Sequence, residues 1–266
     1  MPGQRPAPAA LGRLPEQYFM RLLATVAAAR EAPGERLIDL GRGNPDIPPP
    51  EHVREAVAAA ARELTVPVHG YPPFSGLPSL REAIARRYEA DHGVTLDPER
   101  EVAVVPGTKT GIMLAALATA GDGDAVLLPD PGYPDYPSGV ALAGARAVSL
   151  PLDPTAAFQP DFDAVAAERP ALTVLNYPSN PCATCARDET FPAGVAYVAE
   201  RGGWLLHDLA YDRLAFDGHR ARSVLEAPGA RDVAVELWSP SKVYGIAGWR
   251  IGFLVGSAVV VGRVQR

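Results

Sequence analysis

The sequence predicts an α/β fold, with a seven-stranded, mostly parallel sheet that has helices on both faces. Short apolar runs recur along the chain, and helical stretches fill the gaps between them. Buried strands that alternate with helices are typical of a parallel sheet covered on both sides. The expected strands are 101–106, 124–129, 145–150, 171–176, 203–208, 233–238 and 250–256.

The first hundred residues predict loops and helices. A Pro- and Ala-rich loose arm precedes a stretch of helical spacing, and a later helix begins directly after three prolines, as helices often do. Another helix is expected to end at a glycine. The arm covers 1–11, the helices 15–31, 51–63 and 80–93, and the intervening Gly/Pro-rich loops 41–50 and 69–80.

Composition narrows the class of protein. The chain has 266 residues, 47% of them hydrophobic and 21% charged, which is ordinary for a globular domain. Its net charge of −6 argues against a nucleic-acid or anionic-membrane partner, which usually requires a basic face. We therefore expect small-molecule partners, with no nucleic acid and no membrane.

The sequence also predicts a cytoplasmic location. Cys182 and Cys185 are too few for a disulfide framework. The apolar run at 22–29 is short and lies between two arginines, unlike a signal peptide. No run of about 18 apolar residues exists, so no transmembrane helix is expected.

Polar residues gather where the predicted strands end. In sheets of this kind, ligands bind beyond the carboxyl ends of the strands. Five such ends would meet on one face, which predicts a site there. The segments are 107–109, 130–133, 176–180, 207–208 and 239–242.

Lys242 is the first candidate for chemistry. A lysine after a strand, in a pocket, can have its pKa lowered enough to attack an aldehyde. Ser239 and Arg250 are spaced to hold a phosphate beside it. The plain alternative is a solvated loop lysine. The S-x-x-K spacing also matches a penicillin-binding signature, but Lys109-Thr110-Gly111 precedes it, which is the wrong order.

Asp208 ends a hydrophobic strand, and Tyr211 follows three residues later. A carboxylate there could pair with a protonated pyridine nitrogen and make the ring an electron sink. Tyr211 and Asn180 could hydrogen-bond a phenolic oxygen of such a ring. The alternative is that Asp208 caps the next helix.

The segment 106–111 opens a helix, whose first N–H groups can bind an anion with help from Thr108 and Lys109. Tyr133 follows a strand, where its ring could stack on a flat ligand. Taken singly, these residues also fit a common helix cap and a turn tyrosine.

Together the motifs resemble the fold-type I, class I/II aminotransferases, which depend on pyridoxal 5′-phosphate (PLP). The resemblance is strongest to the branch that contains the LL-diaminopimelate aminotransferases. The motifs occur in family order over residues 41–256, at 43–46, 69–85, 106–111, 129–136, 176–181, 207–218 and 238–253.

The resemblance implies a transaminase that moves an amino group between an amino acid and a 2-oxo acid, with 2-oxoglutarate and glutamate as one pair.

The resemblance also implies a role for each site residue. Lys242 would form the Schiff base with PLP and shuttle the proton, and Asp208 would pair with the pyridine nitrogen. Asn180 and Tyr211 would contact the phenolic oxygen, and the Asn180–Pro181 bond would be cis. Tyr133 would stack on the ring, and Gly43 would lie against the substrate. The phosphate would be bound by Thr108, Lys109, Ser239, Ser241 and Arg250.

The resemblance also implies a homodimer, in which Tyr71 reaches the phosphate in the other subunit. Residues 1–44 would form an N-terminal arm and part of a small domain, and 45–266 the PLP-binding large domain. Family members continue for on the order of a hundred residues into a small C-terminal domain. That domain supplies the arginine that binds the substrate carboxylate, and we expect it to be absent here.

Two departures leave alternatives open. The usual N-P-T-G turn reads Asn180-Pro181-Cys182-Ala183. The C-x-x-C spacing would need two more ligands for a metal site, and a redox pair is the less favoured reading beside incidental cysteines. The alternative functions are a PLP-dependent lyase or synthase on the same fold, or a PLP-binding remnant with little activity.

Overall fold

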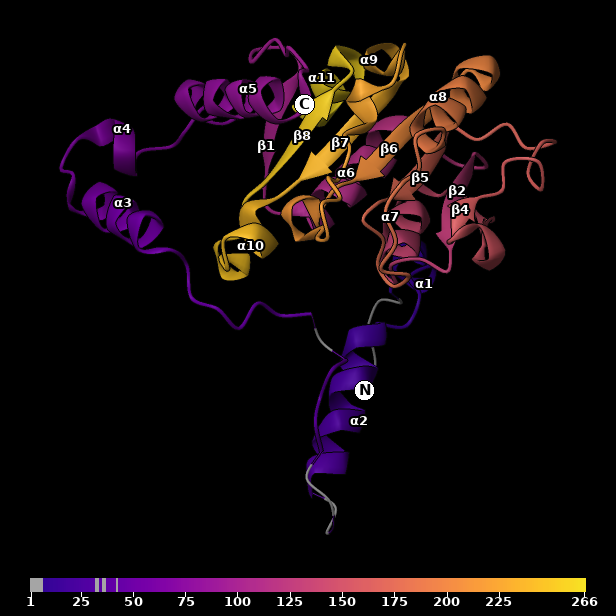
Figure 1. Ribbon diagram of the computed structural model, residues 1–266, viewed down its shortest axis with the longest axis horizontal. Helices are drawn as coiled ribbons and strands as arrows, with labels where there is room; N and C mark the ends of the chain where they lie inside the picture. Colours follow the sequence, from indigo (N-terminus) through magenta and orange to yellow (C-terminus); the bar gives the residue numbers. More distant parts are fainter. Residues whose placement is uncertain (1–6, 32–33, 35–36, 42) are drawn as a thin grey trace, which may run out of the picture.

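An eight-stranded sheet organises the computed structural model, which describes residues 7–31, 34, 37–41 and 43–266 (Figure 1). The strand order is β1-β8-β7-β6-β5-β2-β3-β4. The strands are β1 (Val102–Val105), β2 (Ala125–Asp130), β3 (Arg146–Asp153), β4 (Gln159–Pro160), β5 (Leu172–Asn176), β6 (Trp204–Asp208), β7 (Ala234–Trp238) and β8 (Gly252–Gly256).

The sheet is mostly parallel, as predicted. The pairs β2–β3, β2–β5, β5–β6 and β6–β7 are parallel, whereas β8 runs antiparallel to both β1 and β7. The predicted number of seven strands is one too few, because β4 pairs antiparallel with the end of β3. This strand has only two residues, one of them Pro160, so no run of apolar residues marks it in the sequence.

The predicted helices lie close to their expected positions. Glycines in the left-handed conformation end α5, α7 and α8, at Gly93, Gly144 and Gly202. The helices are α1 (Ala9–Gly12), α2 (Tyr18–Glu31), α3 (Glu51–Arg62), α4 (Val66–His69), α5 (Pro78–His92), α6 (Thr108–Thr119), α7 (Tyr136–Ala143), α8 (Thr190–Arg201), α9 (Ala230–Val233), α10 (Pro240–Val243) and α11 (Ala258–Val264). The arm predicted as loose contains α1, and its residues 1–6 lie outside the described part of the chain. Within that part, no helix has the length and apolar character needed to cross a membrane.

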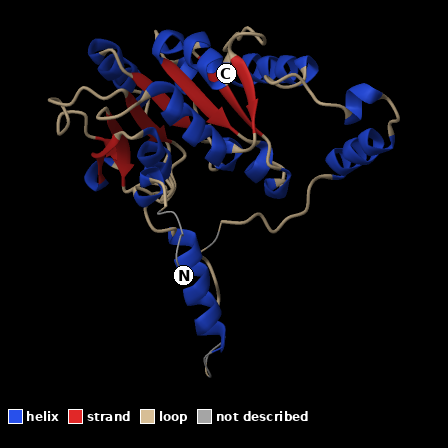
Figure 2. Cartoon of the chain, turned by 180° about the vertical axis from the view of Figure 1, so that it is seen from behind, coloured by secondary structure: helices blue, strands red, loops and turns tan. Residues whose placement is uncertain are grey.

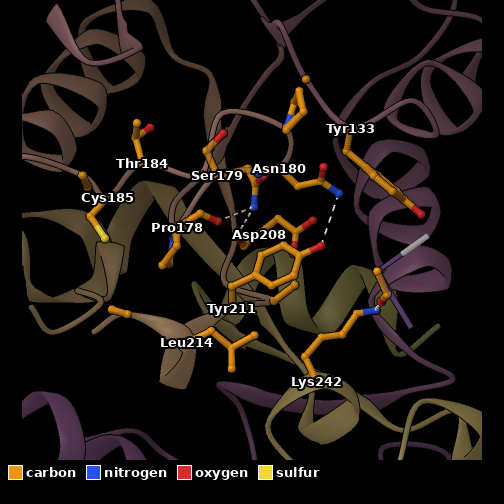
Figure 3. A pocket seen from close by; sticks show the side chains of 18 of the residues that line it. Tyr133, Pro178, Ser179, Asn180, Thr184, Cys185, Asp208, Tyr211, Leu214 and Lys242 are labelled. Atoms are coloured by element: carbon orange, nitrogen blue, oxygen red, sulfur yellow. Dashed lines mark hydrogen bonds between the residues drawn. The ribbon is translucent and has the colours of Figure 1, made fainter. Parts of the chain in front are cut away.

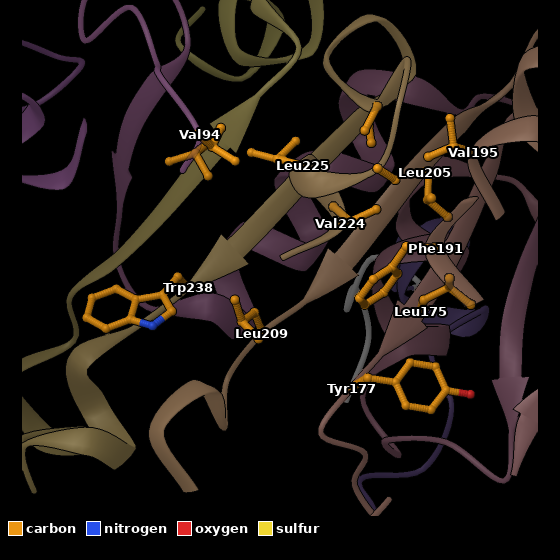
Figure 4. Packing of buried hydrophobic residues seen from close by; sticks show 14 of the residues in the cluster. Val94, Leu175, Tyr177, Phe191, Val195, Leu205, Leu209, Val224, Leu225 and Trp238 are labelled. Carbon is orange, nitrogen blue, oxygen red and sulfur yellow. The ribbon is translucent and has the colours of Figure 1, made fainter. Parts of the chain in front are cut away.

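Hydrophobic layers cover both faces of the sheet (Figure 2). One layer includes side chains of α5 and α8 such as Tyr88 and Phe191, and Figure 4 shows part of it. The other includes side chains of α6, α7 and α11 such as Ile112 and Val261. Because neighbouring strand residues point to opposite faces, Leu205 joins the first layer and Leu206 the second.

The segment before α5 differs from this core. Helices α1, α2 and α3 contain no buried residue among those described. In Figure 1, α2 projects from the body of the molecule. Helices α3 and α4 lie to the left of the body, on a long connection. The division into 1–44 and 45–266 stays a prediction.

Candidate active site

The carboxyl ends of β1, β2, β5, β6 and β7 open onto one large cavity of about 1620 Å³. Residues from the loops after these strands line it, together with residues of α2 and of the segment around Gly43. Eight of the predicted site residues line this cavity, namely Gly43, Thr108, Lys109, Tyr133, Asn180, Asp208, Tyr211 and Lys242. The cavity therefore lies at the edge of the sheet where the strand ends predicted a site.

Lys242 is presented by the short helix α10, directly after β7. Ser239 caps this helix, because its Oγ accepts a hydrogen bond from the Ser241 N–H. The Lys242 Nζ donates a hydrogen bond to the carbonyl oxygen of Gly43. Figure 3 shows Lys242, Tyr211 and Asp208 around the same hollow. The structure thus joins two predicted residues that are 199 positions apart in the chain.

Asp208 is a buried carboxyl at the wall of the cavity. It ends β6 with only 5% of its surface exposed, and burial raises the pKa of its carboxyl to about 6. The Tyr136 hydroxyl donates to Oδ2 over 3.0 Å, which opposes part of that rise. The nearby Ala210 N–H also lowers this pKa, but among the described residues none meets hydrogen-bond geometry with the other oxygen, Oδ1. A buried carboxylate oxygen without a donor is costly, so this atom invites a cationic or N–H partner.

Asn180 and Tyr211 form a pair across the cavity (Figure 3). The Asn180 Nδ2 donates to the Tyr211 hydroxyl over 3.2 Å. The Asn180–Pro181 bond is cis, as predicted. Asn176 holds the turn from inside, because its Oδ1 accepts from the Asn180 N–H and its Nδ2 donates to the Asp208 carbonyl. The pair therefore lies where one flat ring could contact both polar groups.

Tyr133 lies to the right of Asn180 in Figure 3 and lines the same cavity. Its hydroxyl donates to Asp135 over 3.1 Å, and Lys109 forms an ion pair with the same carboxylate over 2.7 Å. Burial and the Asp135 charge raise the pKa of Tyr133. Phe19 of α2 contacts the Tyr133 ring, with 5.9 Å between centroids. These contacts fix the plane of the tyrosine at the cavity wall.

An anion cradle lies at the start of α6. Gly107 has a φ of +85° and precedes the first helical N–H groups. A Cβ on Gly107 would lie 2.3 Å from Nη2 of Arg250, so the guanidinium lies against the glycine backbone. Helix N-termini bind anions through their unpaired N–H groups. Arg250, two residues before β8, thus lies beside the start of α6, where Thr108 is the first helical residue.

Three further predicted site residues, Ser239, Ser241 and Tyr71, are not among the residues that line the cavity. Ser239 and Ser241 are buried, and their hydroxyl oxygens lie 2.7 Å apart. Ser239 also donates to the Ile251 carbonyl, which ties α10 to the start of β8. Tyr71 does not line the cavity and is fully exposed in the connection between α4 and α5. Its predicted contact with another subunit stays a prediction.

The sequence analysis did not single out Tyr136 and Asp135, which hydrogen-bond Asp208 and Tyr133, and it placed Asn176 at the site only as part of the segment 176–180. Tyr136 lies three residues after Tyr133 in the same motif, at the start of α7, so motif position was the available signal. Cys182 and Cys185 are half-buried free thiols, and Cys185 lines the cavity. Ala183 has a φ of +54°, a conformation that favours glycine.

Comparisons with known proteins agree with this geometry. The profile of the family described as "Aminotransferase class I and II" matches residues 35–266. The L-glutamine–4-(methylsulfanyl)-2-oxobutanoate aminotransferase of Bacillus subtilis is 42% identical over 254 residues, covering 94% of this chain and 63% of that protein. The LL-diaminopimelate aminotransferase of Desulforudis audaxviator is 42% identical over 257 residues, covering 95% and 64% respectively.

Solved structures show the same fold. Apo-BacF from Bacillus subtilis superposes with a TM-score of 0.91 at 36% identity, covering 98% of this chain and 67% of that one. Substrate-bound BacF gives 0.89 at 37% identity, with 98% and 66% covered. The chain thus spans a little under two thirds of the length of the curated relatives it matches.

Proposed function

The chain belongs to the class I and II aminotransferase family, and from this premise we propose that it binds PLP and transfers an amino group between an amino acid and a 2-oxo acid. One pair of substrates is proposed to be glutamate and 2-oxoglutarate. The observation that carries the proposal is the buried, donor-less Oδ1 of Asp208, in a cavity that Lys242 also lines.

The donor set of the cavity fits PLP. The pyridine nitrogen, when protonated, supplies the N–H that Asp208 Oδ1 lacks, and it offsets the burial that raises the pKa of this carboxyl. The first turn of α6 and Arg250 offer N–H donors suited to a phosphate. Asn180 and Tyr211 would hold the phenolic oxygen, and Tyr133 would stack on the ring.

Within such a site each residue has a distinct task. PLP, when bound, acts as an electron sink for the charge left at the substrate α-carbon. Asp208 keeps a proton on the ring nitrogen. Lys242 Nζ would hold the cofactor and would move the proton at the substrate α-carbon. Asn180 and Tyr211 orient the ring relative to Lys242, which fixes the path of that proton.

We further propose that the chain works as a homodimer, with residues 1–44 as an arm and part of a small domain. Support comes from Tyr71 and Phe74, which are fully exposed on a connection with large apolar side chains. Sedimentation over a range of concentrations tests the dimer. A Tyr71→Phe variant should bind PLP more weakly only where the dimer forms.

The proposed reaction is tested as a half-reaction. The PLP-loaded chain is mixed with L-glutamate alone, and 2-oxoglutarate and pyridoxamine 5′-phosphate are quantified by mass spectrometry. A transaminase yields equal amounts of both without a second substrate, and Lys242→Ala yields neither. Other amino acids are tested in parallel to define the substrate. Formation of another product with PLP unchanged would favour a lyase or synthase instead.

A further inference from the structure

A buried pair of ionisable residues, His207 and Glu236, lies on the face of the sheet opposite to the Asp208 side chain. His207 precedes Asp208 on β6, and neighbouring strand residues point to opposite faces. Its register partner on β7 is Glu236, and both side chains have no exposed surface. Tyr136, which bonds Asp208, belongs to the second hydrophobic layer, whereas Tyr88, which bonds Glu236, belongs to the first.

Glu236 is surrounded by hydrogen-bond donors. The Tyr88 hydroxyl donates to Oε1 over 2.7 Å, and the Val224 N–H donates to Oε2 over 2.9 Å. The Ser223 hydroxyl lies 2.9 Å from both oxygens. Burial alone would raise the pKa of Glu236, but hydrogen bonds led by His207 hold it below its usual value. The group is therefore an ionised carboxylate that only accepts hydrogen bonds.

Both ring nitrogens of His207 face acceptors. Nδ1 lies 2.7 Å from Glu236 Oε2, and Nε2 lies 2.9 Å from the Tyr177 carbonyl oxygen. A carbonyl oxygen and an ionised carboxylate cannot donate, and a neutral imidazole has only one N–H. Two short contacts to two acceptors therefore require a proton on each nitrogen, which makes the ring a buried cation.

The His207 ring contacts Tyr177, which begins the turn that carries the cavity residue Asn180. Asn176 closes the same turn through the Asn180 N–H and ties it to the Asp208 carbonyl. His207 is covalently bonded to Asp208, so its charge is next in the chain to the carboxylate that faces the cavity.

We propose that His207 and Glu236 form a buried imidazolium–carboxylate pair that positions the Asn180 turn and keeps Asp208 ionised. They are positioning residues, and their value for the cofactor rests on the proposed PLP function. His207, the cation of the pair, is next to Asp208 in the chain. The negative charge of Glu236 lies one strand further away, on β7.

The remaining groups near these residues are few. Toward Asp208 they are the Tyr136 hydroxyl from α7, Tyr133, Tyr211, and Lys242 from α10. Toward the pair they are Tyr88 from α5, Ser223 and the Phe191 ring, whose centroid lies 4.5 Å from that of His207. His92 of α5, whose ring lies 5.5 Å from that of Tyr88, also lowers the pKa of Glu236 by its charge, but the hydrogen bond and the charge of His207 act on Glu236 more strongly.

Nitrogen NMR of the unaltered 266-residue chain, without PLP, tests the protonation directly. The chain has five histidines. Replacing His52, His69, His92 and His219 one at a time assigns the signals of His207 without altering it. We expect two protonated nitrogens in His207 at pH 7, with slow proton exchange. An unprotonated ring nitrogen at that pH would overturn the proposal.

The carboxyl carbon of Asp208 provides the second readout, again without PLP. Its signal is identified by its loss in Asp208→Asn and titrated in the wild type and in His207→Gln. We expect the midpoint to rise by on the order of one pH unit in His207→Gln, because a nearby cation is removed. An unchanged midpoint would contradict the electrostatic role.

His92→Gln is the matched control, because it removes another buried histidine–carboxylate contact, the 2.9 Å pair with Glu226. We expect no change in the Asp208 midpoint in this variant. If His207→Gln does not fold, the nitrogen NMR of the unaltered chain decides. Neither measurement uses PLP, so failure of the chain to bind PLP would count against the proposed function and leave the pair standing.

Discussion

The edge of the sheet at the cavity and the segment before α5 use apolar side chains in opposite ways. Strand residues such as Leu205 and Leu206 have no exposed surface, whereas Leu40 and Leu64 are 90% and 94% exposed. The cavity thus lies at the edge of a packed core, which includes residues of β6. The N-terminal segment has no such core among the described residues, and its apolar surface is suited to a partner. Stability and cofactor binding should therefore respond to different residues.

The largest expected difference concerns packing. Leu205→Ala in β6 should lower the free energy of unfolding by about 2–5 kcal/mol, because it leaves a cavity in the core. Leu64→Ala should change it by less than about 0.5 kcal/mol. Urea unfolding at a concentration where the chain is monomeric measures both. Equal losses in the two variants would show that the segment before α5 is packed after all.

Asp208→Asn tests whether the cavity is electrostatically tuned. PLP should still bind, but the half-reaction with glutamate should slow by about 100-fold or more, the scale of losing one stabilising group. Asp217→Asn is the control, because Asp217 also lines the cavity but is exposed. Stopped-flow absorbance gives the rates. Normal turnover of Asp208→Asn would contradict the role of Asp208.

The same carboxyl should make stability depend on pH. Its pKa in the folded chain is about 6, above its usual value, so the folded state binds the proton more tightly than the unfolded state. The protonated carboxyl contributes to the free energy of unfolding below about pH 4, and this contribution is lost as the pH rises through about 6. Asp208→Asn should therefore stabilise the PLP-free chain at pH 7 by about 3 kcal/mol, and by little at pH 4.

Glu226 provides the opposite case within the same titration. Although burial raises its pKa, hydrogen bonds from His92 and Arg220 outweigh this and lower the value to about 2. Its contribution is present above about pH 4.5 and is lost as the pH falls toward 2. Denaturation curves of Asp208→Asn and Glu226→Gln between pH 3 and 8 should thus diverge in opposite directions. Parallel curves would contradict both assignments.

Gly107→Ala tests the anion cradle. The new Cβ would displace Arg250 from the start of α6, so affinity for PLP should fall about 10-fold. Pyridoxal, which lacks the phosphate, should bind as it does to the wild type. Gly123→Ala is the matched control, because Gly123 has the same φ of +85° but open space at its Cβ. Equal losses for PLP and pyridoxal would contradict the cradle.

Ala183→Gly is expected to have the smallest effect. Ala183 adopts a φ of +54°, which disfavours a residue with a Cβ. The glycine should stabilise the chain by about 0.5–1 kcal/mol in thermal unfolding. Ala196→Gly within α8 should instead destabilise it by about 1 kcal/mol. A loss of stability in Ala183→Gly would show that other contacts set this turn.

Much of the fold could be predicted because each strand of the core is a short apolar run next to a helix with a clear start or end. Six of the seven predicted strands lie within two residues of their predicted bounds, and the seventh, β3, ends three residues later than predicted. The direction of β8 could not be predicted, since buried parallel and antiparallel strands have the same composition. Strand β4 is too short to leave a pattern.

The strand ends predicted that Asp208 and Lys242 lie close together, and both line the cavity. The contacts of Tyr136 and Glu236 could not be predicted, because their partners lie on other elements, as in the Glu236–His207 contact between β7 and β6. Such pairs follow from strand register, which a single sequence does not specify.

The central claim is that Lys242 carries PLP. The chain is incubated with PLP, treated with borohydride, digested and analysed by mass spectrometry, alongside Lys242→Ala and the exposed-lysine control Lys109→Ala. We expect one stable pyridoxyl group per chain, on the peptide that contains Lys242, in the wild type and in Lys109→Ala, and none in Lys242→Ala. Labelling that persists in Lys242→Ala, or its absence from the wild type, would contradict the account.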